Sequence, residues 1–221
     1  MKPILFNIDM VRSILDGKKT QTRRVIKPQP IGRLMGYLQE STSNRDNKYY
    51  GCPVWEGEEL AEHTGCFERH YRKPRYQIGD TLYVRETFLK SDEGYRYKAD
   101  ETIDSEQLRI EYGYKWKPSI HMPKEAARVF LKVTDVRVER LGNMSFADIM
   151  SEGIQTEPMV YDGRLDNLGI QTSYALKIQN DCRKEFVTLW NSIYEKKGYG
   201  WDINPWVWVY EFKKIERSNN D

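Results

Sequence analysis

The sequence predicts a mixed α+β fold in a single domain of 221 residues, because helical and strand-like patterns alternate along it. A helix is expected at 180–197, where apolar residues recur on one helical stripe. Strands are expected at 78–88, with alternating apolar residues, and at 206–212, which is apolar on both faces. A strand that is apolar on both faces is typical of the centre of a sheet.

The first elements are a short helix and a basic strand. Apolar residues at 10, 11, 14 and 15 form one helical stripe, and Gly17 stands where a helix would end. The segment that follows is Lys-Lys-Thr-Gln-Thr-Arg-Arg, residues 18–24. If it is extended, the side chains alternate, with Thr20, Thr22 and Arg24 on one side and Gln21, Arg23 and Val25 on the other. Such a face can bind an anion or carry out chemistry.

Further elements follow from local signals. A strand is expected at 129–138, where the apolar positions change parity between Val133 and Val136, which predicts a bulge near Asp135. Ser145 and Asp148 have the spacing of a capping box, and the helix that they begin should end at Gly153, with Glu152 on its last turn. We expect one common core that contains Leu82, Val84, Val129, Leu131, Val133, Val207 and Val209.

Three segments, at about 31–75, 91–115 and 155–179, are interpreted as insertions in the single domain 1–221. The first shows neither the 3.6-residue period of a helix nor the 2-residue period of a strand for long. The second is acidic, rich in tyrosine and expected to form a hairpin.

Composition limits the classes of function. The 35 basic and 33 acidic residues nearly cancel, so any affinity for nucleic acid must come from a local patch. No apolar run is long enough for a signal peptide or a membrane span, and three cysteines do not form a disulfide framework. We therefore expect a cytoplasmic protein with no membrane partner. P-loop and dinucleotide motifs are absent, and we expect no cofactor.

Three stretches carry a resemblance to a known family: 17–24, 78–87 (Ile-Gly-Asp-Thr-Leu-Tyr-Val-Arg-Glu-Thr) and 141–154. They resemble the ASCH domain, which belongs to the PUA-like superfamily of small β-barrels associated with RNA. Residues 1–30 and 116–123 look more particularly like the ASCH proteins of bacteriophages and prophages. The resemblance covers about 1–30, 76–90, 116–154 and 182–215, and it implies a PUA-like mixed β-barrel with flanking helices.

The resemblance also implies an active site. In bacterial N4-acetylcytidine amidohydrolases, a G-x-K-T-x-T-x-R motif supplies a lysine and a threonine, and a glutamate at the end of a later helix completes the site. The matching residues here make Lys19, Thr22 and Glu152 the expected catalytic set. A threonine hydroxyl needs a neighbouring base, and a lysine can act as that base only if burial or nearby cations lower its pKa. Glu152 would hold the exocyclic nitrogen of cytosine or pass the proton to the leaving amine.

Two other functions remain open from the sequence. The same pocket can bind RNA or a modified base without chemistry, as PUA-like domains commonly do, and ribonuclease activity is known among ASCH proteins. A basic turn after a helix is also often a phosphate-binding or solvated surface. The chain is about twice the length of the small amidohydrolases, so its insertions leave the substrate undefined. The sequence does not indicate the oligomeric state.

Several residues are candidates for contacts with a nucleoside or RNA. Arg85 is expected on a phosphate or base edge and Glu86 at a pocket rim, unless both form ion pairs with the basic loop at 18–24. Trp116 is expected to stack on a base or, with Met122, to plug the end of the barrel. The complete set is Lys18, Thr20, Arg23, Arg24, Arg85, Glu86, Trp116 and His121.

Four residues raise the question of a metal site: Cys52, His63, Cys66 and His70. All four are of types that bind zinc, but their spacing is not one of the common zinc arrangements. We interpret them as ordinary polar residues of an insertion and predict no metal.

Overall fold

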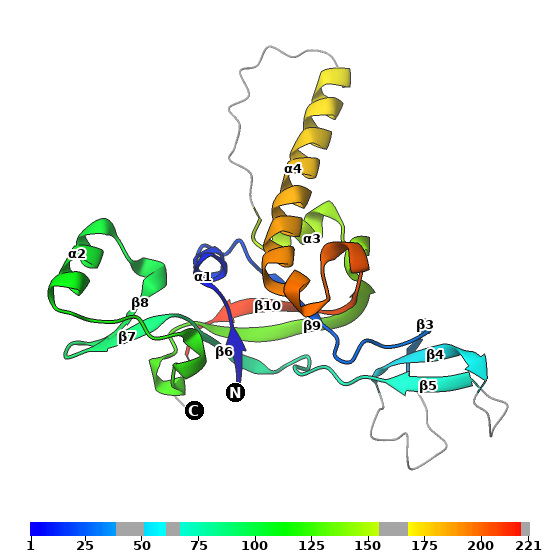
Figure 1. Ribbon diagram of the computed structural model, residues 1–221, viewed down its shortest axis with the longest axis horizontal. Helices are drawn as coiled ribbons and strands as arrows, with labels where there is room; N and C mark the ends of the chain where they lie inside the picture. Colours follow the sequence, from blue (N-terminus) through cyan, green and yellow to red (C-terminus); the bar gives the residue numbers. More distant parts are fainter. Residues whose placement is uncertain (39–50, 61–66, 155–167, 218–221) are drawn as a thin grey trace.

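The computed structural model describes residues 1–38, 51–60, 67–154 and 168–217 and has the predicted mixed α+β architecture (Figure 1). Its main sheet has five strands in the order β1-β6-β9-β10-β2. Strand β1 runs parallel to β6, and the other neighbours are antiparallel. The strand bounds are β1 Lys2–Leu5, β2 Gln21–Val25, β6 Thr81–Arg85, β9 Phe130–Arg140 and β10 Trp206–Ile215.

The expected barrel is not closed by the described strands. Strands β1 and β2 are the two edges of the five-stranded sheet, and no pairing between them is present in the described part of the chain. The architecture is therefore an open mixed sheet with helices.

Strand β10 is internal in the sheet, as its apolar pattern predicts, but its two faces belong to different cores. Trp208 and Tyr210 pack in one cluster, which also contains the predicted residues of β6 and β9. Val207 and Val209 pack on the other face against α3 and α4. The expectation of one common core is wrong for these two valines, because neighbouring residues of a strand point to opposite faces.

Two of the three predicted helices match their predicted end signals, and the third has different bounds. Helix α1 (Ile8–Leu15) is followed by Gly17, whose φ is +72°. Helix α3 (Phe146–Ser151) begins at the capping box formed by Ser145 and Asp148. Helix α4 (Leu168–Tyr194) begins twelve residues before the predicted start, and the helix projects away from the sheet (Figure 1). Its buried stripe, which includes Phe186 and Trp190, marks only the part that covers the sheet.

The predicted bulge in β9 is present. Glu211 pairs with Asp135 and Phe212 pairs with Val133, so one residue of β9 has no partner at this point. The extra residue restores the apolar side chains on both sides of it to the same face of the sheet.

The segments interpreted as insertions contain regular structure of their own. The first includes a three-stranded antiparallel sheet, and Trp55 of this sheet packs edge-on against Trp206, with ring centroids 5.7 Å apart. Its strands are β3 Arg33–Tyr37, β4 Pro53–Leu60 and β5 Phe67–Tyr71. The second contains the expected hairpin, β7 Phe88–Ser91 with β8 Gly94–Tyr97, and in addition α2, Ile103–Glu111. Residues 155–167 of the third lie outside the described residues.

Single turns of 3-10 helix connect several of these elements. They are η2 Lys98–Asp100, η3 Ser119–His121, η4 Lys124–Ala126, η5 Leu141–Asn143, η6 Glu195–Lys197 and η7 Trp201–Ile203. In the described ranges, we find no helix with the length and apolar character needed to cross a membrane.

Candidate functional site

Lys19 and Glu152, two of the three predicted catalytic residues, are in direct contact. Lys19 Nζ donates a hydrogen bond to Glu152 Oε2 over 2.6 Å and another to the backbone carbonyl of Glu152 over 2.7 Å. The two side chains are 0% and 5% exposed. A lysine and a glutamate are thus paired inside the protein, where an unpaired charge would be strongly unfavourable.

The backbone around Lys19 explains why the two residues meet. The amide nitrogens of Lys18 and Lys19 both donate to Ser13 O at the end of α1, and Thr20 N donates to Ser151 O at the end of α3. Thr20 O then accepts a hydrogen bond from Phe212 N of β10. The connection between α1 and β2 is therefore tied to both helix ends and to the sheet.

Gly153 allows this close approach. Its φ is +89°, and a Cβ atom at this position would lie 2.9 Å from Ser13 Cβ and 3.0 Å from Lys19 Cβ. A side chain at 153 would separate α3 from α1 and from Lys19. The predicted glycine therefore does more than end α3, because it also brings Glu152 to Lys19.

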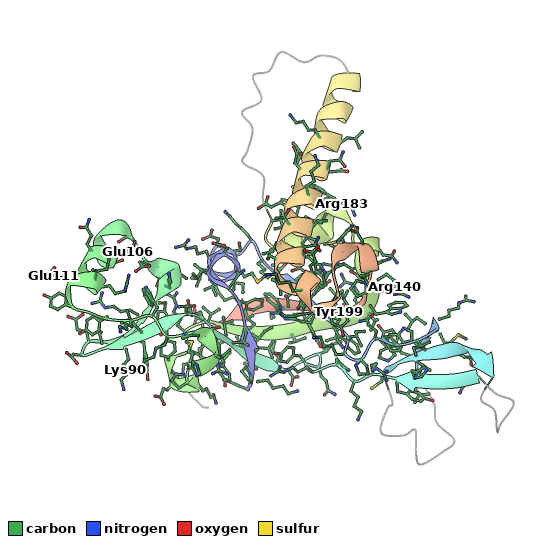
Figure 2. The ribbon with its side chains drawn as sticks, in the orientation of Figure 1. Lys90, Glu106, Glu111, Arg140, Arg183 and Tyr199 are labelled. Carbon is green, nitrogen blue, oxygen red and sulfur yellow. The ribbon has the colours of Figure 1, made fainter. Side chains whose placement is uncertain are left out.

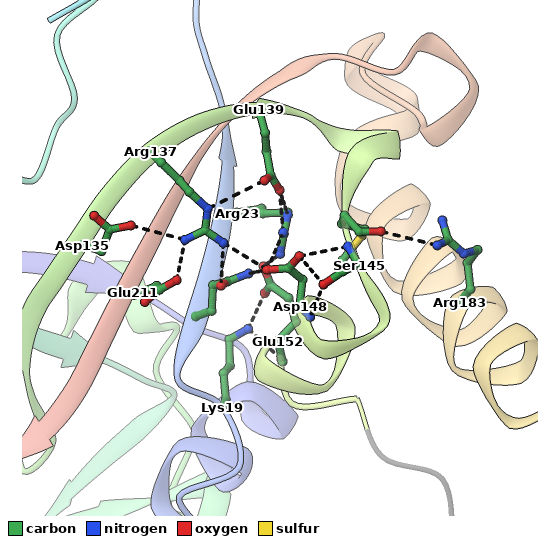
Figure 3. A network of polar contacts seen from close by, with 12 residues as sticks. Lys19, Arg23, Asp135, Arg137, Glu139, Ser145, Asp148, Glu152, Arg183 and Glu211 are labelled. Carbon is green, nitrogen blue, oxygen red and sulfur yellow. Dashed lines mark hydrogen bonds and ion pairs between the residues drawn. The ribbon is translucent and has the colours of Figure 1, made fainter. Parts of the chain in front are cut away.

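Arg23 extends the pair into a larger network (Figure 3). Its Nη1 donates to Glu152 Oε1 over 3.1 Å, and its Nε donates to Glu139 Oε1 over 2.8 Å. Arg23 Nη2 also lies 3.3 Å from Asp148 Oδ1. The arginine side chain is fully buried, so three carboxylates from β9 and α3 surround one guanidinium group.

Arg137 continues the network on β9. Its Nη2 donates to Asp148 Oδ1 over 3.0 Å and to Gln21 Oε1 over 3.1 Å, and its Nη1 bonds to Glu211. Burial alone would raise the pKa of Asp148, but hydrogen bonds from Ser145 and Gln21 and the charge of Arg23 lower it well below its ordinary value. The network fixes α3 to β2, β9 and β10, and so positions Glu152.

Burial lowers the pKa of Lys19 below its ordinary value of 10.5. The ion pair and hydrogen bond with Glu152 oppose this effect, whereas the charges of Arg24 and Arg23 add to it. An amine whose pKa is lowered gives up its proton more readily, which is the property that a lysine general base requires.

Thr22 lies on the other face of β2. It pairs with Tyr210 in β10 and is buried, whereas Arg23 pairs with Val209. The predicted alternation of side chains in this strand is therefore confirmed. None of the hydrogen bonds between described residues involves the Thr22 hydroxyl. The structure thus brings Lys19, Arg23 and Glu152 together and places Thr22 on the opposite face of β2 from Arg23.

The other basic-loop residues have separate surroundings. Lys18 is exposed, and its Nζ lies 3.5 Å from Asp16 Oδ2. Thr20 is also exposed. Arg24 donates from Nη2 to Leu5 O over 2.8 Å, and its guanidinium carbon lies 5.3 Å from the centroid of the Phe6 ring. The predicted set of cations therefore does not form one exposed surface.

Arg85 and Glu86 do not pair with the basic loop, and this alternative is wrong. Arg85 donates to the carbonyl of Ile120. Glu86 is fully buried and accepts two hydrogen bonds from Arg128, over 2.9 and 3.1 Å. Burial raises the pKa of Glu86, although Arg128 opposes the effect. Glu86 directly follows β6, and its ion pair with Arg128 does not include Lys19.

Trp116 and His121 lie on the long connection before β9. The Trp116 indole donates to Glu101 Oε1 over 3.1 Å and is half-buried, whereas His121 is exposed. Met122 is buried beside Phe88 and Phe130. Met122 thus has the packing role that was one alternative for this loop.

The metal candidates are only partly described. Cys52 is a buried free thiol, and His70 lies in β5. His63 and Cys66 lie outside the described residues. Among the residues that the structure does place, no group of three or more metal-binding side chains is found.

Four members of the network were not predicted from the sequence: Gln21, Arg137, Glu139 and Asp148. The sequence indicated Asp148 only in the capping box, not in contact with arginine. One signal for them is present in the sequence. Residues 137 and 139 alternate with Val136 and Val138 at and just beyond the end of the strand predicted at 129–138, which indicates that one face of the strand is charged there. Arg137 and Glu139 are only partly exposed, so partners of opposite charge stabilise them.

Comparisons with protein-family models, with curated proteins and with solved structures found no significant match.

Proposed function

We propose that the protein is an amidohydrolase that removes an acyl group from a modified nucleobase or nucleoside, of the N4-acylcytidine type, and that its fold is a PUA-like fold of the ASCH type. The observation that carries the proposal is the contact between Lys19 and Glu152. These are the two residues, far apart in the chain, that the resemblance assigns to one site. A buried amine with a lowered pKa is the chemical feature that such a site requires.

In the proposed reaction, neutral Lys19 accepts the proton of the Thr22 hydroxyl, directly or through one water molecule. Thr22 Oγ1 attacks the acyl carbonyl, and the bond between the acyl carbon and the exocyclic nitrogen breaks. Lys19 hands the proton that it took from Thr22 to Glu152, which passes it to the leaving amine. Water then hydrolyses the ester on Thr22, which releases the carboxylic acid and restores the hydroxyl. The first step requires the Lys19 amine to reach Thr22, which lies on the opposite face of β2 from Arg23.

Arg23 has a supporting role in this proposal. It binds the second carboxylate oxygen of Glu152, and Glu139 and Asp148 hold its guanidinium group. The orientation of Glu152 is therefore fixed from two sides, by Lys19 and by Arg23. A rigidly held carboxylate can transfer a proton without first reorganising its surroundings.

A second candidate is a binding module that recognises RNA or a modified base without chemistry. It is favoured by the burial of the Lys19 and Glu152 side chains, which form a closed pair. Such a pair can be purely structural, since removal of either charge would leave the other one buried.

One experiment separates the two candidates. Purified protein is incubated with N4-acetylcytidine and with single-stranded RNA, while product formation and binding are measured on the same preparation. Release of cytidine and acetate supports the hydrolase. Binding without product supports the module, and neither binding nor product contradicts both.

A further inference from the structure

A cavity of about 710 Å³ lies at the opposite end of the molecule from β3–β5 (Figure 1). The β7–β8 hairpin, α2, the segment that follows α2, and Arg128 form its walls. Figure 2 shows this region, with Lys90 labelled on the hairpin and Glu106 and Glu111 on α2. Lys19, Thr22 and Glu152 are not among the lining residues, so the cavity is separate from the proposed hydrolase site.

The wall of this cavity is rich in aromatic rings, and hydrogen bonds at their polar ends fix three of them. Tyr97 OH donates to Ala126 O over 2.6 Å, Tyr95 OH donates to Glu125 Oε1 over 2.9 Å, and the Trp116 indole donates to Glu101. Such rings offer flat, preorganised surfaces on which a planar ligand can stack. The aromatic lining consists of Tyr95, Tyr97, Tyr112, Tyr114 and Trp116.

The arginines of the wall are already paired with carboxylates. Arg109 Nε donates to Glu101 over 3.1 Å, Arg128 bonds to both Glu86 and Asp100, and Arg96 bonds to Glu93. An anionic ligand at any of these arginines would also lie close to the negative charge of its carboxylate partner. A phosphate group is therefore disfavoured in this cavity.

Two carboxylates of the wall offer free acceptors. Asp92 forms no ion pair with any residue in the described ranges, and both hydrogen bonds to Glu101 go to Oε1, which leaves its Oε2 available. Carboxylate oxygens accept hydrogen bonds from amino and imino groups. The cavity thus combines stacking surfaces with acceptors and favours a neutral or cationic ligand.

We propose that this cavity binds a nucleoside whose base carries an exocyclic amino group. The base stacks on the aromatic wall, and its amino group donates to a wall carboxylate. The volume lies in the range of small-molecule pockets and leaves room for the sugar beside the base.

The test is a titration of the ¹⁵N-labelled full chain, in which the indole N–H signal of Trp116 is assigned with the Trp116→Phe variant. The ligands are adenosine, cytidine, uridine and cytidine 5′-monophosphate. We expect saturable shifts of the Trp116 signal with adenosine and cytidine, weaker binding of uridine, which lacks the amino group, and weaker binding of the monophosphate than of cytidine.

Two variants test whether the nucleoside binds in the cavity. Tyr112→Ala removes an exposed ring and should raise Kd about tenfold. Tyr37→Ala removes an exposed ring of β3, outside the cavity, and should leave Kd unchanged. The proposal is overturned if adenosine and cytidine leave the Trp116 signal unshifted up to their solubility limits, or if Tyr112→Ala binds them as the wild type does. It is also overturned if uridine binds as well as cytidine, or if the monophosphate binds more tightly than cytidine. Hydrolysis at Thr22 is measured separately, so either proposal can fail alone.

Discussion

Lys19 Nζ and Glu152 Oε2 lie 2.6 Å apart, although their residues are 133 positions apart in the chain. The contact joins the start of β2 to the end of α3, and both side chains are buried. It is at once the centre of the proposed site and a structural link, so variants at these positions must be judged by stability as well as by activity.

Replacement of Lys19 by methionine should be destabilising by about 3 kcal/mol, because it removes a buried partner of Glu152. Arg23 would still pair with Glu152, which limits the loss. The double variant Lys19→Met/Glu152→Gln should recover part of the stability, since no uncompensated carboxylate remains. Denaturant unfolding measures both values, and equal stability of Lys19→Met and the wild type would contradict the pairing.

The stability of the wild type relative to Lys19→Met should depend on pH at the alkaline end. The pKa of Lys19 is lowered in the folded protein, so between that value and 10.5 the unfolded state binds more protons than the folded state. The free energy of unfolding of the wild type should therefore increase relative to that of the variant as the pH rises toward 10.5. A difference that does not change with pH would show that the pKa of Lys19 is not lowered.

Gly153→Ala should be destabilising through steric contact with Ser13 and Lys19. Gly79→Ala is a matched control, because Gly79 has the same φ of +89° and a Cβ at position 79 would have no atom within 4 Å among the described residues outside its immediate chain neighbours. Strain from φ alone is common to both variants and costs about 1 kcal/mol. The melting temperature of Gly153→Ala should be clearly lower than that of Gly79→Ala. Equal melting temperatures would mean that the close approach of Gly153 to Ser13 and Lys19 does not matter for stability.

The pair of Glu86 and Arg128 predicts a second pH dependence. The pKa of buried Glu86 is raised above its ordinary value of 4.5, so its contribution to stability is complete below that pH and is lost as the pH rises through its folded value. Arg128→Met removes the charge that opposes this shift. The loss of stability relative to the wild type should therefore increase as the pH rises above 4.5.

A control isolates the carboxylate in that measurement. In the background of Glu86→Gln, the group that titrates is absent, so Arg128→Met should cost the same stability at every pH. A pH dependence that persists in this background would have to come from another partner of Arg128, such as Asp100.

Local signals predicted much of the main sheet and its helices. Gly17, the Ser145 capping box and the bulge near Asp135 each depend on neighbouring residues, and each is present in the structure. The central position of β10 followed from the apolar character of both its faces. That same character should have predicted two cores, since each face must be covered by different residues.

The partners of charged residues could not be predicted in the same way. Arg128 pairs with Glu86 across 42 positions, and Arg23 pairs with Glu139 across 116, and sequence spacing carries no information on such contacts. The start of α4 at Leu168 was also missed, because the apolar stripe that predicted this helix begins only at Cys182. Of the site itself, the resemblance predicted that Lys19 and Glu152 meet, whereas the catalytic roles of Lys19, Thr22 and Glu152 stay predictions.

The most direct test of the hydrolase proposal compares Thr22→Val with Thr22→Ser in the hydrolysis of N4-acetylcytidine. Valine keeps the shape of the buried side chain and removes only the hydroxyl, whereas serine keeps the hydroxyl. Thr188→Val, at an exposed threonine of α4, controls for the substitution itself. We predict that the wild type, Thr22→Ser and Thr188→Val release cytidine and that Thr22→Val, although folded, does not. Undiminished hydrolysis by Thr22→Val, or no hydrolysis by the wild type, would contradict the account.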